Sequence, residues 1–341
     1  MPLTLTVDRT RWQTHLRGLL EDVPGLVPVA KGNGYGFGLR MLATETARLG
    51  LRTLAVGVAQ EVAAVRAGGF AGDVVVLNPW RPFDDAATAL LDDSRIITTV
   101  SRAEDLRAVA ASHAHARVIV EIETSMHRHG LRPDELSERD LADLTFEGWA
   151  VHLPASGSLE EAKRLASAAL AVKRAPVWVS HLSVSDYRAL RTALGVRTHM
   201  RIGTRLWLGE KRAYTTTATV LDLHRVRSGE RLGYHQVKAP RDGWIVVVSG
   251  GTAHGVAMAA PTPQRSLRQR GVTVAQGVLD ALGRSLSPFA IGGRKRAFAE
   301  PPHMHSSMVF VAGADAGVRI GDEVPVTARM TTVTADEVRM V

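Results

Sequence analysis

Short runs of apolar and β-branched residues recur along the first two-thirds of the chain, and stretches with a helical spacing of apolar residues separate them. Such runs predict buried strands, and the longer stretches predict crossover helices. The eight predicted strands are 26–31, 53–57, 73–78, 95–100, 117–123, 146–152, 177–181 and 199–207. The helices predicted between them include 38–49, 59–67, 103–111, 159–173 and 184–194. This alternation predicts a (β/α)8 barrel of the TIM type.

The pattern changes after about residue 212. A Thr/Val-rich alternation at 214–221 is followed by apolar runs at 244–249, 308–311 and 322–326, with glycine-rich turns between them. Alternation with a period of two is typical of half-buried strands. We therefore predict a mixed α/β and all-β protein, with the barrel over residues 1–212 and a C-terminal β-domain over residues 213–341.

The composition excludes several classes of chemistry. The chain of 341 residues contains no cysteine, which excludes disulfides, thiolate metal sites and a cysteine nucleophile. Its amino terminus lacks the apolar core of a signal peptide, and no apolar stretch is long enough to span a membrane. We therefore expect a cytoplasmic protein with no membrane partner.

The formal charge of +8 raises the question of a nucleic-acid partner. Basic residues are mixed with acidic ones along the whole length, however, and the densest basic run is only Arg294-Lys295-Arg296. Aromatic residues for base stacking are scarce, at 5% of the chain. We expect no nucleic-acid partner.

The strongest candidate for chemistry is Lys31, which directly follows the first predicted strand. Four glycines lie within the next seven residues, up to Gly38. A lysine amine that loses contact with water has a lowered pKa and can form a Schiff base, and glycines let the backbone pass close to a flat ligand. Residue chemistry leaves open the alternative that Lys31 extends into solvent and the glycines form a loose turn.

The segment 31–38 resembles the lysine motif of the alanine racemase family, Lys-Ala-Asn-Ala-Tyr-Gly-His-Gly. The family contains fold-type III proteins dependent on pyridoxal 5'-phosphate (PLP). Lys31, Asn33, Tyr35, Gly36 and Gly38 match the motif. The resemblance implies that Lys31 forms the Schiff base with PLP and is one of two racemisation bases, and that Tyr35 contacts the phosphate.

A second block follows in the family's order. Residues 121–130 resemble Lys-Val-Asp-Thr-Gly-Met-x-Arg-x-Gly, which aligns Arg128 with the arginine that contacts the cofactor hydroxyl and the substrate carboxylate. An arginine fork suits a planar anion. Glu121 stands where many racemases have a carbamylated lysine, and a carboxylate supplies the same charge. A surface ion pair of Arg128 with Glu121 or Glu123 is the alternative.

Three further matches lie at predicted strand ends. His152 resembles the family histidine beside the pyridine ring, although strand-end histidines are more often structural. Residues 181–185 resemble His-x-x-Asn-Ser, and residues 201–204 resemble Arg-Pro-Gly-Ile, whose arginine faces the pyridine nitrogen and whose backbone amides bind phosphate. The cofactor-binding set that the resemblance implies is Lys31, Tyr35, His152, Ser185, Arg201, Gly203 and Thr204.

The predicted β-domain departs from the family at the second base. Residues 251–255 correspond to Gly-Tyr-Ala-Asp-Gly, whose tyrosine comes from the partner subunit, and Thr252 stands in its place. A threonine hydroxyl is a poor base, whereas His254 can titrate near neutrality and is the candidate replacement. His235 and Tyr234 are further alternatives.

The substrate-carboxylate position also differs, because residues 303–306 correspond to Cys-Met-Asp-Gln and place Met304 there. His254, His303 and His305 raise the alternative of a metal site. The nearest carboxylate, Glu300, lies in a proline-rich turn, and we expect no metal.

The leading hypothesis is a PLP-dependent amino-acid racemase, an isomerase, with alanine as the default small-molecule substrate and a role in peptidoglycan precursor supply. We expect a head-to-tail homodimer. The alternative, favoured by Thr252, is a PLP-binding homologue without turnover that has a carrier, regulatory or cell-wall-related role. A different PLP reaction on the same fold, such as decarboxylation or aldol cleavage, has no positive sign in the sequence.

Overall fold

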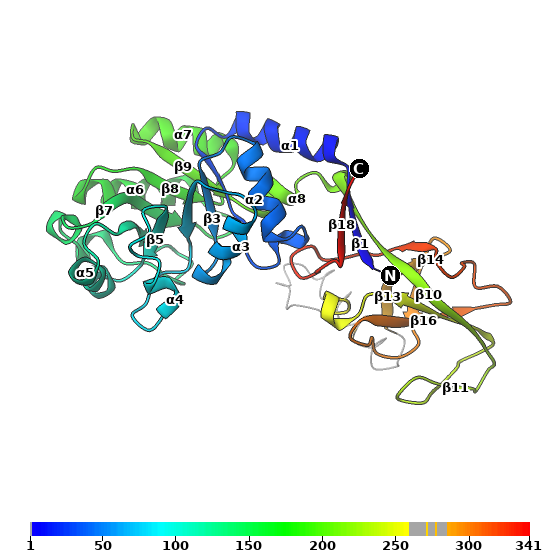
Figure 1. Ribbon diagram of the computed structural model, residues 1–341. Helices are drawn as coiled ribbons and strands as arrows, with labels where there is room; N and C mark the ends of the chain where they lie inside the picture. The colour runs from blue at the N-terminus through cyan, green and yellow to red at the C-terminus, as the bar shows by residue number, and fades with distance from the viewer. Residues whose placement is uncertain (1, 259–270, 272–276, 278–284) are drawn as a thin grey trace. The chain divides into compact units, whose positions relative to one another are not determined.

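The computed structural model describes residues 2–258, 271, 277 and 285–341. The chain divides into two compact units (Figure 1). One, here called the barrel unit, contains residues 13–210, and the other, the β-unit, combines residues 1–12 with residues 211–341. The predicted boundary at residue 212 lies close to the observed one, but the first twelve residues, predicted in the barrel, belong to the β-unit.

The barrel unit contains eight parallel strands in the order β2-β9-β8-β7-β6-β5-β4-β3. A parallel bridge between Val29 and Ala55 closes the ring between its first and last strands. The predicted (β/α)8 barrel is therefore confirmed. The strands are β2 (Leu26–Pro28), β3 (Thr53–Val56), β4 (Asp73–Val76), β5 (Ile96–Val100), β6 (Arg117–Ile122), β7 (Thr145–His152), β8 (Val177–Ser180) and β9 (Thr198–Ile202).

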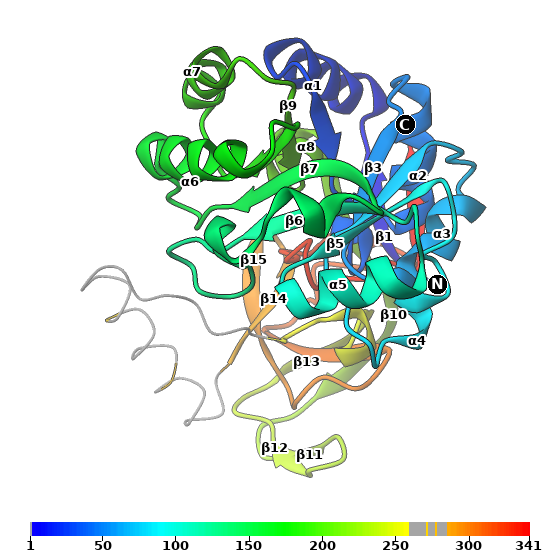
Figure 2. The same ribbon diagram turned by 90° about the vertical axis from the view of Figure 1, so that its left-hand side faces the viewer.

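Helices surround these strands, as α5, α6 and α7 illustrate in Figure 2. The last predicted strand was too long, because the chain turns at Gly203 and residues beyond it form α8. Serine side chains cap the N-termini of α6 and α7 by accepting backbone N–H groups of their first turns. The helices are α1 (Arg9–Asp22), α2 (Leu39–Arg48), α3 (Val62–Ala67), α4 (Asp85–Thr88), α5 (Ala103–Ser112), α6 (Leu159–Val172), α7 (Val184–Leu194) and α8 (Thr204–Leu208).

The inside of the barrel is filled by a layer of apolar side chains to which strands β3–β8 each contribute one residue. Burying them removes apolar surface from water, which is the main favourable term in folding. Trp178 is the largest member of this layer, and the His199 ring stacks on it at 4.1 Å. The layer consists of Val27, Val29, Ala55, Val75, Ile97, Ile119, Ala150 and Trp178.

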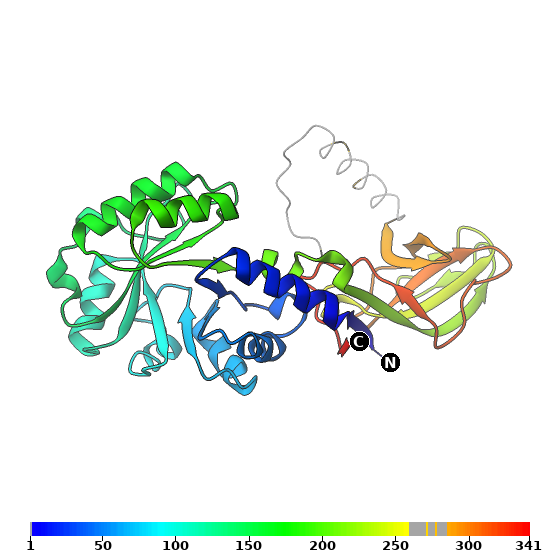
Figure 3. The ribbon, with the colours of Figure 1, turned by 90° about the horizontal axis from the view of Figure 1, so that it is seen from above.

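The β-unit is built on one largely antiparallel sheet in the order β14-β15-β16-β13-β10-β1-β18, with β17 beside β10. Strand β1 pairs antiparallel with β10 and parallel with β18, so the first and last strands of the chain lie side by side (Figures 1 and 3). The predicted C-terminal β-domain is confirmed. Its strands are β1 (Leu3–Val7), β10 (Tyr214–Val226), β13 (Gly243–Ser249), β14 (Leu286–Ile291), β15 (Arg294–Phe298), β16 (Ser306–Ala312), β17 (Glu323–Pro325) and β18 (Glu337–Met340), with a small hairpin of β11 (Arg231–Leu232) and β12 (Val237–Lys238).

In the described part of the chain, no helix has the length and apolar character needed to cross a bilayer.

Candidate functional site at the carboxyl end of the barrel

A layer of polar side chains lies inside the barrel next to the apolar layer, on the side of the carboxyl ends of the strands. Side chains two positions apart on a strand face the same way, so residues that follow the core positions by two also face inward. Because the strands are parallel, these residues gather at the carboxyl end, where barrel proteins bind ligands. They are Glu121 on β6, His152 on β7, Ser180 on β8 and Arg201 on β9.

Arg201 is the most deeply buried charge of this layer. It is 6% exposed, and among the described residues its Nε and Nη2 atoms have no hydrogen-bond partner. Burial lowers its pKa, while the charge of Glu121 acts in the opposite direction. A buried donor without an acceptor is costly, which indicates a position prepared for the acceptor atoms of a ligand.

A cavity of about 390 Å³ adjoins this arginine. That volume lies within the range of small-molecule sites, roughly 300–1,000 Å³. The cavity is lined by Ala155, His181, Leu182, Ser183, Met200, Arg201, Ile202, Gly203, Thr204 and Arg205.

Lys31 follows β2 in a solvent-accessible turn. Partial burial lowers its pKa, and the positive charges of Arg128 and Arg201 lower it further, while Glu61 acts in the opposite direction. The carboxylate of Glu61 accepts the backbone N–H of Gly32 at 2.6 Å and that of Gly57 at 2.6 Å. Glu61 thus fixes the turn that carries Lys31, a role that the sequence analysis did not predict.

Tyr35 lies buried in the next turn and joins this region to the start of α8. Its φ of 54° is in the left-handed region, which is strained for a tyrosine. Its hydroxyl shares a hydrogen bond with Thr204, and burial raises its pKa to about 12. A side chain at Gly203 would collide with the Tyr35 hydroxyl. The structure therefore brings Tyr35, Gly203 and Thr204 together, and their role in binding phosphate stays a prediction.

Two histidines face each other at the rim of the cavity. The rings of His152 and His181 lie 5.1 Å apart edge to face, and Nδ1 of His152 is 2.8 Å from the Ser180 hydroxyl. Burial, followed by the charges of Arg201 and Arg128, lowers the pKa of His152 to about 2. Burial, followed by the charges of Arg201, Lys31 and Arg128, also lowers the pKa of His181. Both rings are therefore neutral at physiological pH and present flat apolar faces.

Arg128 is exposed in the loop after β6, and in the part of the chain that the structure describes it forms no ion pair. Glu123, one of its two alternative partners, binds His127 instead at 2.9 Å. Arg128 nevertheless acts electrostatically on Lys31, and its guanidinium remains open to an anionic partner.

Ser185 lies in the first turn of α7, with its hydroxyl 2.9 Å from that of Ser183. It is Ser183, the N-cap of α7, that lines the cavity. The sequence analysis missed Ser183, although a serine directly before a helical pattern is a recognisable capping signal.

The predicted residues of the β-unit have different environments. Thr252 is exposed, and Met304 is exposed by 66%. His254 is buried, and both of its ring nitrogens are engaged: Nδ1 accepts the Gly251 N–H at 3.2 Å, and Nε2 donates to Asp336 at 3.0 Å. This geometry leaves His254 no free lone pair for a proton, so its role as a base stays a prediction that the structure does not favour. Within the described residues, no three potential metal-binding side chains gather.

A cavity lined by arginine and histidine side chains at the carboxyl end of a parallel barrel is the place where barrel proteins of this class bind small molecules. Residues 7–210 match the sequence profile of the family described as "Alanine racemase, N-terminal domain", and the chain belongs to this family.

Individual relatives agree with that assignment. The chain is 28% identical over 173 residues to an alanine racemase of Desulfovibrio desulfuricans, a match that covers 47% of this chain and 46% of the relative. It is 35% identical over 138 residues to a biosynthetic alanine racemase of Salmonella typhimurium, covering 39% and 37%. The matched regions thus span less than half the length of these relatives.

Solved structures extend the likeness of the fold to the whole chain. An alanine racemase from Bartonella henselae with covalently bound pyridoxal phosphate superposes with a TM-score of 0.73 at 18% identity, covering 100% of this chain and 99% of that one. At this identity, the superposition shows the fold alone.

Proposed function

We propose that the protein is a PLP-dependent amino-acid racemase, with Lys31 as the residue that holds the cofactor. The observation that carries this proposal is the buried guanidinium of Arg201, which lies beside a cavity of suitable size and whose Nε and Nη2 have no partner in the part of the chain that the structure describes. A pyridine nitrogen is the kind of acceptor that such a donor requires. The covalently bound cofactor of the Bartonella henselae relative supports the same group.

The residues of the site fit the parts of this cofactor. The amine of Lys31 would hold the aldehyde carbon, and the neutral ring of His152 would pack beside the pyridine. Tyr35, Ser183 and the backbone amides of Gly203 and Thr204 would bind the phosphate, with Ser185 supporting Ser183. Arg128, which has no ion-pair partner among the described residues, would bind the substrate carboxylate.

The reaction would depend on proton transfer by residues of this chain. When bound, pyridoxal phosphate supplies an electron sink that stabilises the electron pair left at the α-carbon of an amino acid. Lys31, whose pKa is lowered, would take the α-proton from one face as a neutral amine. Arg201 would stay protonated beside the ring, because an arginine remains charged even when burial lowers its pKa.

We further propose that the protein is a homodimer in which the β-unit of a second copy completes each site, with alanine as the first substrate to test. A PLP-binding protein without turnover is the second candidate. It is favoured by the exposed Thr252 and by His254, whose two ring nitrogens are both bound.

The test combines spectroscopy with isotope exchange. The purified protein with added PLP is expected to absorb at about 420 nm, and the Lys31→Ala variant should lose this band. Lys163→Ala, a surface lysine that pairs with Glu160, is the control and should keep it.

Incubation with single amino acids in D2O should then place deuterium at the α-carbon and produce the opposite enantiomer, as seen by chiral chromatography. A bound cofactor without exchange for any amino acid would favour the second candidate. Absence of the absorption band would overturn both candidates.

A further inference from the structure

The β-unit contains an open pocket of about 620 Å³ beside the β11–β12 hairpin. Its lining combines histidines, a buried carboxylate and exposed apolar side chains, among them Tyr234 and Met304, exposed by 83% and 66%. We call it the His303 pocket. It is lined by Tyr234, His235, Thr252, Glu300, Pro301, Pro302, His303, Met304, His305 and Ser306.

Glu300 is part of the lining of this pocket and is 4% exposed. One carboxylate oxygen is 2.7 Å from Nε2 of His303, and the other accepts the backbone N–H of His235 at 3.3 Å. The hairpin passes closely over the carboxylate at Gly233, where any side chain would collide with it. A buried carboxylate is stable only when its oxygens are bonded, so Glu300 fixes the orientation of the His303 ring.

The hydrogen bond to Glu300 also determines which nitrogen of His303 is basic. A carboxylate only accepts hydrogen bonds, so Nε2 carries the hydrogen and Nδ1 carries the lone pair. In the described part of the chain, Nδ1 forms no hydrogen bond, and the side chain is 29% exposed to the pocket. A histidine held by a buried carboxylate through one nitrogen and open at the other is the arrangement of a general base.

His254 has the opposite arrangement, because its Nδ1 already accepts a backbone N–H. Thr252, which occupies the position of the family's second base, is adjacent to His303: its backbone N–H donates to the His303 carbonyl at 2.8 Å. His303, whose Nδ1 can act as a base, therefore lies next to Thr252, the position at which the family has its second base.

We propose that His303 is the second base of the racemase and that Glu300 is its positioning residue; this inference rests on the proposed function. In the proposed homodimer, Nδ1 of His303 from the second copy takes the proton from the α-carbon of the bound amino acid as the C–H bond breaks, and the electron pair stays with the substrate. Lys31, in its ammonium form, then returns a proton to the opposite face. The reverse direction uses the two groups in exchanged roles.

The test measures α-deuterium exchange for each enantiomer separately, together with racemisation and the absorption band. His303→Gln is expected to slow racemisation by about 10²–10⁴-fold, the usual contribution of a general base. Exchange should be lost for one enantiomer and kept for the other, with the absorption band unchanged. Glu300→Gln should weaken exchange of the same enantiomer only, whereas a general loss of structure would lower both.

His224→Gln is the matched control, because His224 also pairs with a carboxylate, that of Asp222, but both side chains are exposed. It should leave both exchanges unchanged. His303→Ala provides a test that is independent of folding, since free imidazole should restore the lost exchange.

Equal exchange of both enantiomers in His303→Gln would overturn the assignment of His303 while leaving the racemase proposal intact. Absence of any exchange in the wild-type protein would overturn the proposed function itself.

Discussion

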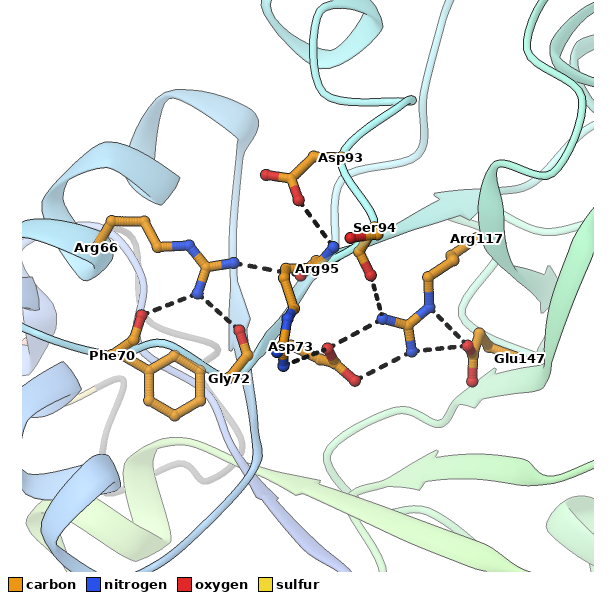
Figure 4. A network of polar contacts seen from close by, with 9 residues as sticks. All are labelled: Arg66, Phe70, Gly72, Asp73, Asp93, Ser94, Arg95, Arg117 and Glu147. Atoms are coloured by element: carbon orange, nitrogen blue, oxygen red, sulfur yellow. Dashed lines mark hydrogen bonds and ion pairs between the residues drawn. The ribbon is translucent and has the colours of Figure 1, made fainter.

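Arginine side chains at the two ends of the barrel differ in how many of their donors are hydrogen-bonded within the fold. At the amino end, Arg117 on β6 donates to Glu147 at 2.7 Å, to Asp73 at 3.0 Å and to the Ser94 carbonyl at 2.8 Å (Figure 4). At the carboxyl end, two nitrogen atoms of Arg201 have no partner within residues 2–258 and 285–341. At the amino end, the arginine donors are bonded to acceptors of the protein itself. At the carboxyl end, donors of Arg201 are available for a ligand.

This contrast matches the division of work in barrel proteins, where one end stabilises the fold and the other carries the chemistry. Arg66 extends the amino-end network by donating to the carbonyls of Phe70 and Gly72 at 2.8 and 2.6 Å (Figure 4). The Arg66 bonds fix the connection between α3 and β4, and the Arg117 bonds join β6 to the beginnings of β4 and β7. Substitutions at the two ends should therefore separate stability from activity.

The largest expected effect is that of Arg201→Met on activity. In the proposed racemase this charge lies beside the cofactor ring, and removing it should lower kcat/KM by about 10²–10³-fold. The ligand-free protein should unfold at the same or a higher urea concentration, because an unpaired buried charge is replaced by an apolar side chain. Urea titration without cofactor and a racemisation assay measure the two quantities, and a marked loss of stability would remove the contrast between the ends.

Arg117→Met should show the reverse behaviour. It removes the partner of the Glu147 carboxylate and the nearer of the two arginines beside Asp73, and it should cost about 3 kcal/mol of unfolding free energy. Activity of the folded fraction should be unchanged. Arg95→Met is the control, because Arg95 is exposed and lies 3.9 Å from Asp73, and its change should stay within about 0.5 kcal/mol. Equal losses in the two variants would contradict the assignment.

The smallest effect concerns pH. The folded-state pKa of His152 is about 2, below its ordinary value of 6.5, so between these values the unfolded chain binds one proton more. Stability must then fall as the pH falls below 6.5. His152→Gln removes this contribution, and its loss of stability from pH 6 to pH 5 should be about 1 kcal/mol smaller than that of the wild type. Parallel urea titrations at the two pH values test this, and identical losses would contradict it.

Much of the barrel could be predicted from local patterns, because each strand is a short apolar run whose neighbours in sequence are also its neighbours in the ring. The inward polar layer followed from the same periodicity, with Glu121, His152 and Arg201 at strand ends. Strand β1 escaped prediction because its partners lie more than 200 residues away. The end of β9 was misplaced because the apolar run continues into α8.

The remaining parts of the site depend on contacts between residues that are distant in sequence, and the spacing of residues along the chain does not predict such contacts. The sequence predicts His254 as a candidate base. In the structure, its Nε2 is bound to Asp336, which lies 82 residues later in the chain. Glu300 and His303 are only three residues apart, yet the burial of Glu300 depends on a hairpin some 65 residues earlier in the chain. Glu61 binds two loops through backbone N–H groups, which leave no trace in the sequence.

The pairing of β1 with β10 and β18 has a consequence for synthesis on the ribosome. The barrel unit is one continuous segment, residues 13–210, inserted between two parts of the β-unit. It can fold as soon as that segment has emerged, whereas β1 must wait for β10 on one edge and for β18 on the other. Until residues 337–340 have been made, one edge of β1 stays unpaired, and any delay in their synthesis prolongs the exposure of this edge to other proteins.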